Sequence, residues 1–368
     1  MRATAIIALA LASIVDAAWA GPPDRSGAHA TDWPSALLGA AESGRIVRTD
    51  PAIDGLIPAG ARLEQIAGGH TWVEGPLWDA SNRQLLFTDI PRNAVYRWRE
   101  GKGVDVFLTP SGYSGTAPFP GREPGANGLV LDRQGRLVLC EHGDRRISRL
   151  EANGSRTTLV ARYQGRRLNS PNDAVFRANG DLYFTDPPFG LPGAFDDPAR
   201  ELEFSGVYRL RSNGTLDLLT RELRAPNGIA FSPDERTLYV TDVDAARPAW
   251  LAFDVLEDGT ISGRRLIKDA GSLLPARRGG PDGLEVDIHG NLFAAGPEAV
   301  YILAPDGRVL GAIETGVPTA NVAWGDDGST LYITAETSVY RIRLTTRGAH
   351  IPDRVMESDN SALERTQR

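Results

Sequence analysis

The hydrophobic positions of this chain follow the same plan six times between residues 75 and 334. In each copy an apolar run enters a turn rich in Gly, Asn or Asp, and a second apolar run returns, which is the pattern of a β-hairpin. A third apolar run usually follows, as at 94–98 and 146–150, and a weaker fourth run comes after another Gly turn, as at 156–160. Each copy therefore predicts one four-stranded antiparallel sheet. The hairpins span 75–88, 128–140, 173–185, 228–241, 283–295 and 322–334.

A polar residue stands just before each hairpin, and the distances between successive copies are 53, 45, 55, 55 and 39 residues. Repeats of this length are typical of propeller blades. A generic β-sandwich or barrel would not repeat the same four-strand unit behind the same polar position, so the pattern predicts an all-β fold, a six-bladed β-propeller over 61–345. The last copy lacks an obvious fourth run after Leu344, and we expect 61–67 to supply it and close the ring. The six polar residues are Glu74, Asn127, Asn172, Asn227, Asp282 and Asn321.

The N-terminal 20 residues have the pattern of a secretory signal peptide. Arg2 precedes an apolar core that is too short to span a bilayer, and Ala18-Trp19-Ala20 stands at the expected cleavage point. The alternative is an uncleaved membrane anchor. We therefore expect a periplasmic or secreted protein that has no membrane contact after cleavage.

Two further segments flank the predicted propeller. Residues 21–60 form a lead segment, with a short helix expected near 33–41, and residues 346–368 form a polar C-terminal tail that we expect to be loosely held. The oligomeric state does not follow from the sequence.

Composition agrees with a compact, turn-rich chain. The hydrophobic fraction is 41% and the charged fraction 24%, while 40 Gly and 25 Pro suit an all-β fold. The net charge is -7 and the basic residues are scattered, so we expect no nucleic-acid partner. Cys140 is the single cysteine, which excludes an internal disulfide and is more typical of a buried small hydrophobe than of a nucleophile.

The six polar residues open the strands that line a propeller's channel, so we expect their side chains to converge at one mouth. Two carboxylates and four amides are hard oxygen ligands, and His and Cys are absent from all six positions. Such a set favours one bound divalent cation, Ca²⁺ first, with Mg²⁺ or Mn²⁺ as alternatives and Zn²⁺ less suited. For any single pair, Asn-Gly or Asp-Gly is better explained as a simple turn. The recurrence at one point of each repeat favours the metal site.

Four short motifs around these residues resemble the gluconolactonase family, which includes regucalcin (senescence marker protein) and, more distantly, diisopropyl fluorophosphatase. The resemblance covers about residues 60 to 345, and it is specific because the motifs occur together in this order. The bacterial secreted members are the most similar in the stretch 140–146. The four motifs are Val73-Glu74-Gly75-Pro76-Leu77-Trp78, Asn169-Ser170-Pro171-Asn172-Asp173, Ala225-Pro226-Asn227-Gly228 and Gly280-Pro281-Asp282-Gly283.

The resemblance implies a six-bladed propeller with one catalytic divalent cation in its channel. It implies that Glu74, Asn227 and Asp282 bind the metal, that Asn172 lies beside it as ligand or substrate contact, and that Asp282 is the general base. The expected reaction is hydrolysis of a lactone, such as a sugar-acid lactone like gluconolactone. The cation would polarise the carbonyl, while Asp282 would take a proton from water and return it to the leaving alkoxide.

The remaining candidate residues are those expected to bind the small-molecule substrate. Besides Asn172, we expect Asn127 and Asn321 of the ring to contact it. Regucalcin-like members carry an Arg two residues before the position of Asn172, where this chain has Ser170, so recognition through that Arg does not carry over. His142 and Arg145 could replace this contact, although a histidine at such a place is often structural. Tyr113, in the Gly-rich stretch 110–115, could cover the channel mouth or lie in an ordinary surface loop.

Two other kinds of function fit the same fold. One is a metal-dependent phosphoesterase, or another hydrolase or lyase that uses the same ring. The other is a non-catalytic ligand-binding propeller whose ion holds the ring together. Serine-hydrolase and nucleotide-binding chemistry is not indicated, because the sequence has no Gly-x-Ser-x-Gly elbow and no Walker loop.

Overall fold

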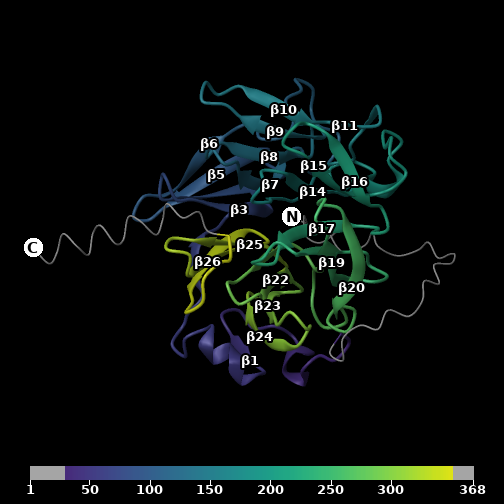
Figure 1. The fold of residues 1–368 in the computed structure, drawn as a ribbon. Coiled ribbons are helices and arrows are strands. Elements are labelled where there is room, and N and C mark those ends of the chain that lie inside the picture. The colour runs from purple at the N-terminus through teal and green to yellow at the C-terminus, as the bar shows by residue number, and fades with distance from the viewer. Residues whose placement is uncertain (1–29, 351–368) are drawn as a thin grey trace, which may run out of the picture.

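The computed structural model describes residues 30–350, and six antiparallel sheets of four or five strands surround a central channel (Figure 1). The prediction of an all-β six-bladed propeller is thus confirmed. The helices of the described chain are short 3-10 turns, η1 (Ser35–Leu37), η2 (Pro51–Gly55) and η3 (Ala194–Asp196). None of the helices within 30–350 is long and apolar enough to cross a bilayer. The predicted signal peptide and most of the predicted tail at 346–368 lie outside the described residues.

Blades 1 to 3 each run outward from the channel in sequence order. Blade 1 comprises β3 (Val73–Asp79), β4 (Gln84–Asp89), β5 (Ala94–Arg99) and β6 (Gly103–Leu108). Blade 2 comprises β7 (Ala126–Leu131), β8 (Leu137–Glu141), β9 (Arg146–Leu150) and β10 (Arg156–Val160), followed by a small hairpin of β11 (Arg162–Tyr163) and β12 (Arg166–Arg167). Blade 3 comprises β13 (Ala174–Phe176), β14 (Leu182–Asp186), β15 (Gly206–Leu210) and β16 (Leu216–Thr220).

Blades 4 to 6 repeat this plan, and the last two also use strands from the N-terminal side. Blade 4 comprises β17 (Pro226–Phe231), β18 (Thr237–Asp242), β19 (Ala249–Val255) and β20 (Ile261–Asp269). Blade 5 comprises β21 (Leu284–Val286), β22 (Leu292–Gly296), β23 (Ala299–Leu303), β24 (Val309–Glu314) and β1 (Ile46–Arg48). Blade 6 comprises β25 (Thr319–Gly325), β26 (Thr330–Ala335), β27 (Ser338–Arg343) and β2 (Glu64–Ala67).

Strand β2 closes the ring as expected. It pairs antiparallel with β27, with Glu64 opposite Arg341 and Ala67 opposite Val339. Blade 6 therefore joins the N-terminal side of the propeller to its C-terminal end, which leaves no long unpaired edge at the seam.

The lead segment is more structured than the sequence indicated. The helix expected near 33–41 is reduced to the single turn η1, whereas β1 adds a fifth strand to the outer edge of blade 5. Trp33 lies beside this blade, with its ring centroid 5.1 Å from that of Tyr301 and its indole N–H donating to Asp269 O at 2.7 Å. The short run Ile46–Arg48 was too brief to be read as a strand without its partner.

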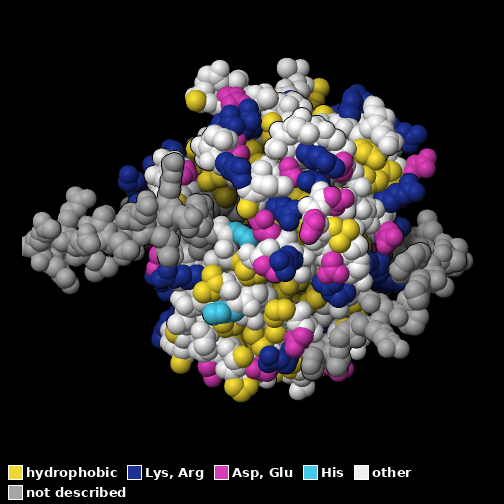
Figure 2. Space-filling view, in the orientation of Figure 1, with side chains coloured by type: hydrophobic (Ala, Val, Ile, Leu, Met, Phe, Trp, Pro, Cys, Tyr) yellow, Lys and Arg dark blue, Asp and Glu magenta, His cyan; other side chains and the backbone are white. Residues whose placement is uncertain are grey.

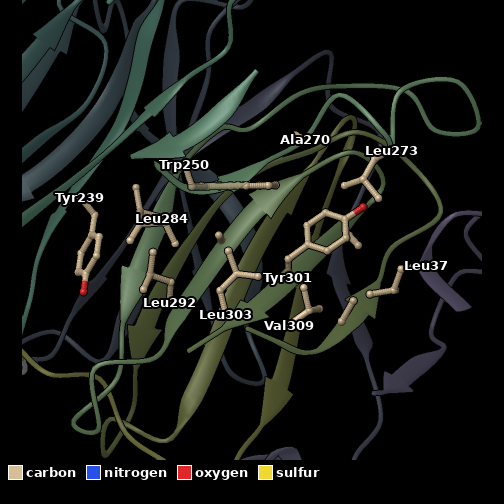
Figure 3. Close-up of a cluster of buried hydrophobic side chains, with 14 of the residues drawn as sticks. Leu37, Tyr239, Trp250, Ala270, Leu273, Leu284, Leu292, Tyr301, Leu303 and Val309 are labelled. Atoms are coloured by element: carbon tan, nitrogen blue, oxygen red, sulfur yellow. The ribbon is translucent and has the colours of Figure 1, made fainter. Parts of the chain in front are cut away.

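Each interface between neighbouring blades has its own hydrophobic cluster. The one between blades 4 and 5 contains Trp250, Tyr301 and Leu284, and Leu37 of the lead segment packs into it (Figure 3). Equivalent clusters fill the other five interfaces, for example Phe184 and Val138 between blades 2 and 3. Apolar side chains on both faces of the blades explain why the inner strands are continuous hydrophobic runs in the sequence. Figure 2 shows acidic and basic side chains interspersed over the visible face.

The hairpin turns have the backbone that their residues predict. Gly135, Gly180 and Gly290 adopt positive φ at the first turn of blades 2, 3 and 5. Arg83 and Glu235 take the same left-handed conformation at the matching turns of blades 1 and 4. The first hairpin of each blade then returns its second strand to the same mouth of the channel from which the first strand began.

Candidate active site at the channel mouth

The six predicted polar residues lie side by side around one mouth of the channel. A Cβ placed on Gly75 would lie 2.2 Å from Asn127 O, and one on Gly283 would lie 1.9 Å from Asn321 Oδ1. Contacts this short link each position to the next blade. Asn172 O likewise accepts a 2.8 Å hydrogen bond from the Gly128 N–H. We call the set Glu74, Asn127, Asn172, Asn227, Asp282 and Asn321 the polar ring.

Three of the glycines that follow ring residues serve close packing rather than turns. Gly128, Gly228 and Gly283 do not have positive φ, so the alternative of a simple Asn-Gly or Asp-Gly turn is wrong at these positions. A Cβ on Gly228 would meet Asp282 O at 2.4 Å. Real side chains do not approach backbone this closely, and glycine is therefore required where the blades meet at the channel.

The ring residues stand where the innermost strands depart from regular pairing. In blade 1 the register of β3 with β4 shifts between Glu74 and Leu77, and in blade 4 that of β17 with β18 shifts between Pro226 and Ile229. In blade 5 regular pairing starts only at Leu284. Bulges of this kind turn side chains out of the sheet, which here aims the ring residues at the channel.

A second layer supports the ring from the ends of the second strands. The Thr88 hydroxyl donates to Asn127 O at 3.1 Å, the Thr185 hydroxyl donates to Asn227 O at 2.6 Å, and Thr241 Oγ1 accepts the Gly228 N–H at 2.7 Å. These threonines are fully buried. They fix the backbone of the ring residues, and their positions in neighbouring blades explain the recurrence of Thr at the end of the second strand.

The acidic residue that follows each of these threonines holds the loop that leads to its ring residue. Asp89 accepts the Thr71 N–H at 3.0 Å, Asp186 accepts the Asn169 N–H at 2.8 Å, and Asp242 accepts the Ala225 N–H at 2.9 Å. The sequence analysis missed this layer. The repeated Thr-Asp at 88–89, 185–186 and 241–242 was the signal that could have revealed it.

The two carboxylates of the ring oppose each other electrostatically. Burial raises the pKa of Glu74, and the charge of Asp173 raises it further, whereas hydrogen bonds from the Gly75 N–H and the Asn321 amide act in the other direction. Burial also raises the pKa of Asp282, and the charges of Glu74, Asp173 and Glu123 add to this effect. A positive charge placed among these groups would stabilise their ionised forms.

The donors present fit a hard divalent cation. The Oδ1 atoms of Asp282 and Asn172 are buried without a hydrogen-bond partner among the described residues, and the Asn227 amide hydrogen-bonds to Asp282. Within 30–350 no three or more His, Cys, Asp and Glu side chains are grouped as a metal site, so an ion here would depend on amide oxygens as well. Buried oxygens without donors are what Ca²⁺ coordinates in proteins.

Asn321 and Asn127 differ in what their side chains do. The Asn321 amide hydrogen-bonds to both Glu74 and Asp173, and its Oδ1 accepts the Val322 N–H at 2.8 Å. Asn321 is therefore engaged in holding carboxylates. Asn127 is buried, and its backbone carbonyl lies beside Gly75, which follows Glu74 of the ring.

His142 lies in the turn that follows β8, at the same mouth. It is fully buried, and its Nδ1 lies 2.9 Å from Glu123 Oε2 in the loop that precedes β7. Its backbone N–H donates to Gly125 O at 3.1 Å, two residues before Asn127. The structure thus places His142 on the blade 2 side of the ring.

Arg145 and Ser170 brace the loops around the mouth. The Arg145 Nε donates to Leu168 O at 2.8 Å and to Asn169 O at 2.9 Å, and its Nη1 donates to Ala199 O at 2.9 Å. The Ser170 hydroxyl donates to Pro187 O at 2.6 Å. These contacts fix the approach to Asn172 and use Nε and Nη1 of Arg145, whereas its Nη2 is buried without a partner among the described residues.

Tyr113 belongs to the loop that crosses from blade 1 to blade 2. Its ring packs 5.1 Å from the ring of Phe119, and its backbone contacts Gly143, where a Cβ would lie 2.5 Å from that of Tyr113. Asn93 Nδ2 donates to Tyr113 O at 2.9 Å. The loop therefore packs against the turn that carries His142, at the rim of the mouth.

Two further carboxylates in the channel were missed by the sequence analysis. Asp173 lies one residue after Asn172, and burial raises its pKa to about 6. Burial likewise raises the pKa of Glu285 to about 8. Both line a cavity of about 240 Å³ on the other side of the ring, whose walls include Trp78 and Trp324. Glycine follows most of the ring residues, but Asp173 stands at this position after Asn172. This departure from the repeat was the sequence signal for an additional carboxylate.

Comparison with known proteins gives a consistent result. The SMP-30/Gluconolactonase/LRE-like region matches residues 72–337. A gluconolactonase from Zymomonas mobilis is 38% identical over 313 residues, covering 83% of this chain and 87% of the relative. The pentonolactonase XacC of Haloferax volcanii is 26% identical over 271 residues, covering 71% of this chain and 80% of the relative. The solved structure of a gluconolactonase from Xanthomonas campestris superposes with a TM-score of 0.71 at 34% identity, covering 83% of this chain and 97% of that one.

Proposed function

Because the chain belongs to the SMP-30/gluconolactonase/LRE-like family, we propose that it is a lactonase that opens a sugar-acid lactone, such as gluconolactone, with the help of a divalent cation. The names of its relatives support the reaction class, since they include gluconolactonases and a pentonolactonase. The observation that carries the proposal is the polar ring, in which Asp282 and Asn172 keep buried oxygens without donors.

We assign the cation to Glu74, Asn172, Asn227 and Asp282, with Ca²⁺ as the first choice because all four donors are hard oxygens. When bound, such a cation would draw electron density from the lactone carbonyl and make its carbon more electrophilic. The fully buried Glu74 is held by the Gly75 N–H and the Asn321 amide, which suits a ligand that does not move.

Asp282 is the best placed of these residues to act as general base. It is only half-buried, whereas Glu74 is buried, and its Oδ1 has no donor in the described part of the chain. A water molecule that approaches the lactone carbon can therefore give its proton to Asp282 as the new C–O bond forms. The Asn227 amide orients the carboxylate during this step.

Proton release by the purified protein on sugar and aliphatic lactones tests the proposal. We expect activity that is lost after chelation, returns best with Ca²⁺, and falls by at least about a hundredfold in Asp282→Asn. Asp306→Asn is the matched control, because Asp306 is an exposed carboxylate in the turn between β23 and β24. Equilibrium dialysis with Ca²⁺ measures the cation site independently of activity.

Two results would contradict the proposal. Full activity in the presence of chelator would refute the role of the cation. A protein that binds Ca²⁺ yet hydrolyses no lactone would refute the reaction, and it would favour a phosphoesterase or a ligand-binding propeller.

A further inference from the structure

The pair formed by the buried His142 and the partly exposed Glu123 is not used by the mechanism above. His142 Nδ1 lies 2.9 Å from Glu123 Oε2, which is within ion-pair distance although the direction is not that of a hydrogen bond. The Nε2 atom, on the other side of the imidazole, is buried and has no hydrogen-bond partner among residues 30–350. A buried polar atom left without a partner is costly, so its retention indicates a ligand or a reacting group.

The position of this pair complements that of Asp282. His142 follows β8 of blade 2, and Asp282 precedes β21 of blade 5, so they stand three positions apart in a ring of six blades. They therefore stand on opposite sides of the mouth. The His142 N–H donates to Gly125 O at 3.1 Å, and Gly125 lies two residues before Asn127 of the polar ring and two residues after Glu123, which places the pair beside the polar ring.

The imidazole is held in place by its surroundings. A Cβ on Gly190 would lie 2.5 Å from His142 Cβ, and one on Gly143 would lie 2.5 Å from Pro124 O. Both loops thus press on the turn that carries His142, and glycine is needed at each contact. A side chain fixed in this way has a defined direction for its free nitrogen.

The other ionisable side chains near this turn have partners of their own, although Arg145 Nη2 and Asp186 Oδ1 are buried without one among the described residues. Glu141 pairs with Arg146 at 2.6 Å and with Arg156 at 2.9 Å, and Arg145 donates to backbone carbonyls. Asp144 forms an ion pair with Arg146 at 3.2 Å. Asp186 accepts a hydrogen bond from the Asn169 N–H at 2.8 Å. Glu123, with its side chain about one third exposed, is the group that can stabilise a charged imidazole.

We propose that His142 is the general acid of the lactonase reaction and that Glu123 is its positioning partner. This assignment rests on the proposed function and divides its two proton transfers between opposite sides of the mouth. Asp282 takes a proton from the attacking water. His142 Nε2–H then gives its proton to the ring oxygen of the lactone as the C–O bond breaks.

The protons balance over one turnover. After the ring opens, the new hydroxyl group carries the proton from His142, and the imidazole is neutral. The new carboxylic acid returns a proton to the imidazole, and Asp282 releases its proton to solvent. The sum is one lactone and one water converted to a hydroxycarboxylate and one proton.

Substrates with different leaving groups test whether His142 donates the second proton. An aliphatic lactone expels an alkoxide, which needs a proton at that moment, whereas dihydrocoumarin expels a phenoxide, which is stable without one. We expect His142→Gln to lower kcat/KM on δ-gluconolactone and δ-valerolactone by about a hundredfold or more, and on dihydrocoumarin by less than about threefold. Glu123→Gln should show the same preference with a smaller loss. The matched control is His289→Gln, because His289 lies exposed in the turn between β21 and β22.

Each outcome decides the assignment. An equal loss on both substrate types would show that His142 only packs the mouth, and no loss on either would show that it is a bystander, so both refute the acid role. If His142→Gln has a lowered melting temperature, the substrate preference of Glu123→Gln decides instead. Wild-type protein that opens neither substrate type would overturn the proposed function itself, and the acid role with it.

Discussion

Among residues outside the hydrophobic clusters, Glu314 at the end of β24 is the one whose substitution should destabilise the propeller most. Its Oε2 accepts the Arg45 Nε–H at 2.7 Å and the Glu42 N–H at 2.8 Å, and its Oε1 accepts Arg277 Nη2 at 2.6 Å. Glu314 and Arg277 side chains are both fully buried. Because Arg277 lies in the loop that leads to Asp282, one carboxylate joins the lead segment to the candidate active site.

The expected loss of stability in Glu314→Gln follows from this burial. The change leaves the Arg277 guanidinium buried with a neutral partner, and breaking a buried ion pair from one side costs about 3 to 5 kcal/mol. Since 1.4 kcal/mol is tenfold, the unfolding equilibrium should shift by about a hundredfold to a few thousandfold. An exposed pair is worth only about 0 to 1 kcal/mol, so Asp54→Asn, which removes the exposed contact to Arg48, is the control.

Guanidinium unfolding followed by tryptophan fluorescence measures this difference, because Trp33 and Trp250 lie beside the affected blade. A loss below about 1 kcal/mol for Glu314→Gln, equal to that of the control, would refute the reasoning, since the pair would then behave as an exposed one.

The same residue predicts a dependence on pH. Burial alone would raise the pKa of Glu314, but hydrogen bonds from Arg45, the Glu42 N–H and Arg277 lower it below the ordinary value. A lowered pKa gives stability that is present above the ordinary pKa and is lost as the pH falls through the folded-state value. The stability gap between wild type and Glu314→Gln should therefore be full at neutral pH and narrow in acid. A gap that widens in acid would contradict this assignment.

Three further predictions concern the ring, the lead segment and the thiol. Gly283→Ala should lower lactonase activity and Ca²⁺ binding at least about tenfold, because its Cβ would lie 1.9 Å from Asn321 Oδ1, whereas Gly55→Ala has open space and should change neither in dialysis and activity assays. Trp33→Ala should lower the free energy of unfolding by about 3 to 5 kcal/mol in chemical denaturation, and a loss under 1 kcal/mol would show that the lead segment is not part of the core. Cys140, whose thiol pKa burial raises, should react with a thiol reagent only after unfolding, and fast labelling of native protein would contradict its burial.

Much of the fold was readable from the sequence because it depends on local patterns. Each blade begins with a hairpin whose apolar runs and turn residues lie within about fifteen positions, as in 283–295. The polar ring was predicted from recurrence alone, and the structure brings Glu74, Asn127 and Asp282 to one mouth. The closing strand at 64–67 followed from the missing fourth strand of the last blade.

Other features depended on contacts between distant segments. β1 pairs with a strand more than 260 residues away, and three residues without a partner carry no strand signal. No local pattern predicted that Arg145 Nε and Nη1 donate to the carbonyls of Leu168, Asn169 and Ala199. The pairing of His142 with Glu123 joins two loops whose conformations no local pattern determines.

The sequence by itself determined the periodic part of this protein, namely the strands, their turns and the residues that open each blade, because alternation and turn chemistry act over a few neighbouring positions. The tertiary structure alone decided what those residues face. Gly128, Gly228 and Gly283 look like turn residues in the sequence, yet they are glycines because the next blade's ring backbone or side chain lies within 2.8 Å of where a Cβ would stand. Such close approach, and the loss of hydrogen-bond partners at Asp282 and Asn172, arise only when six blades pack around one channel.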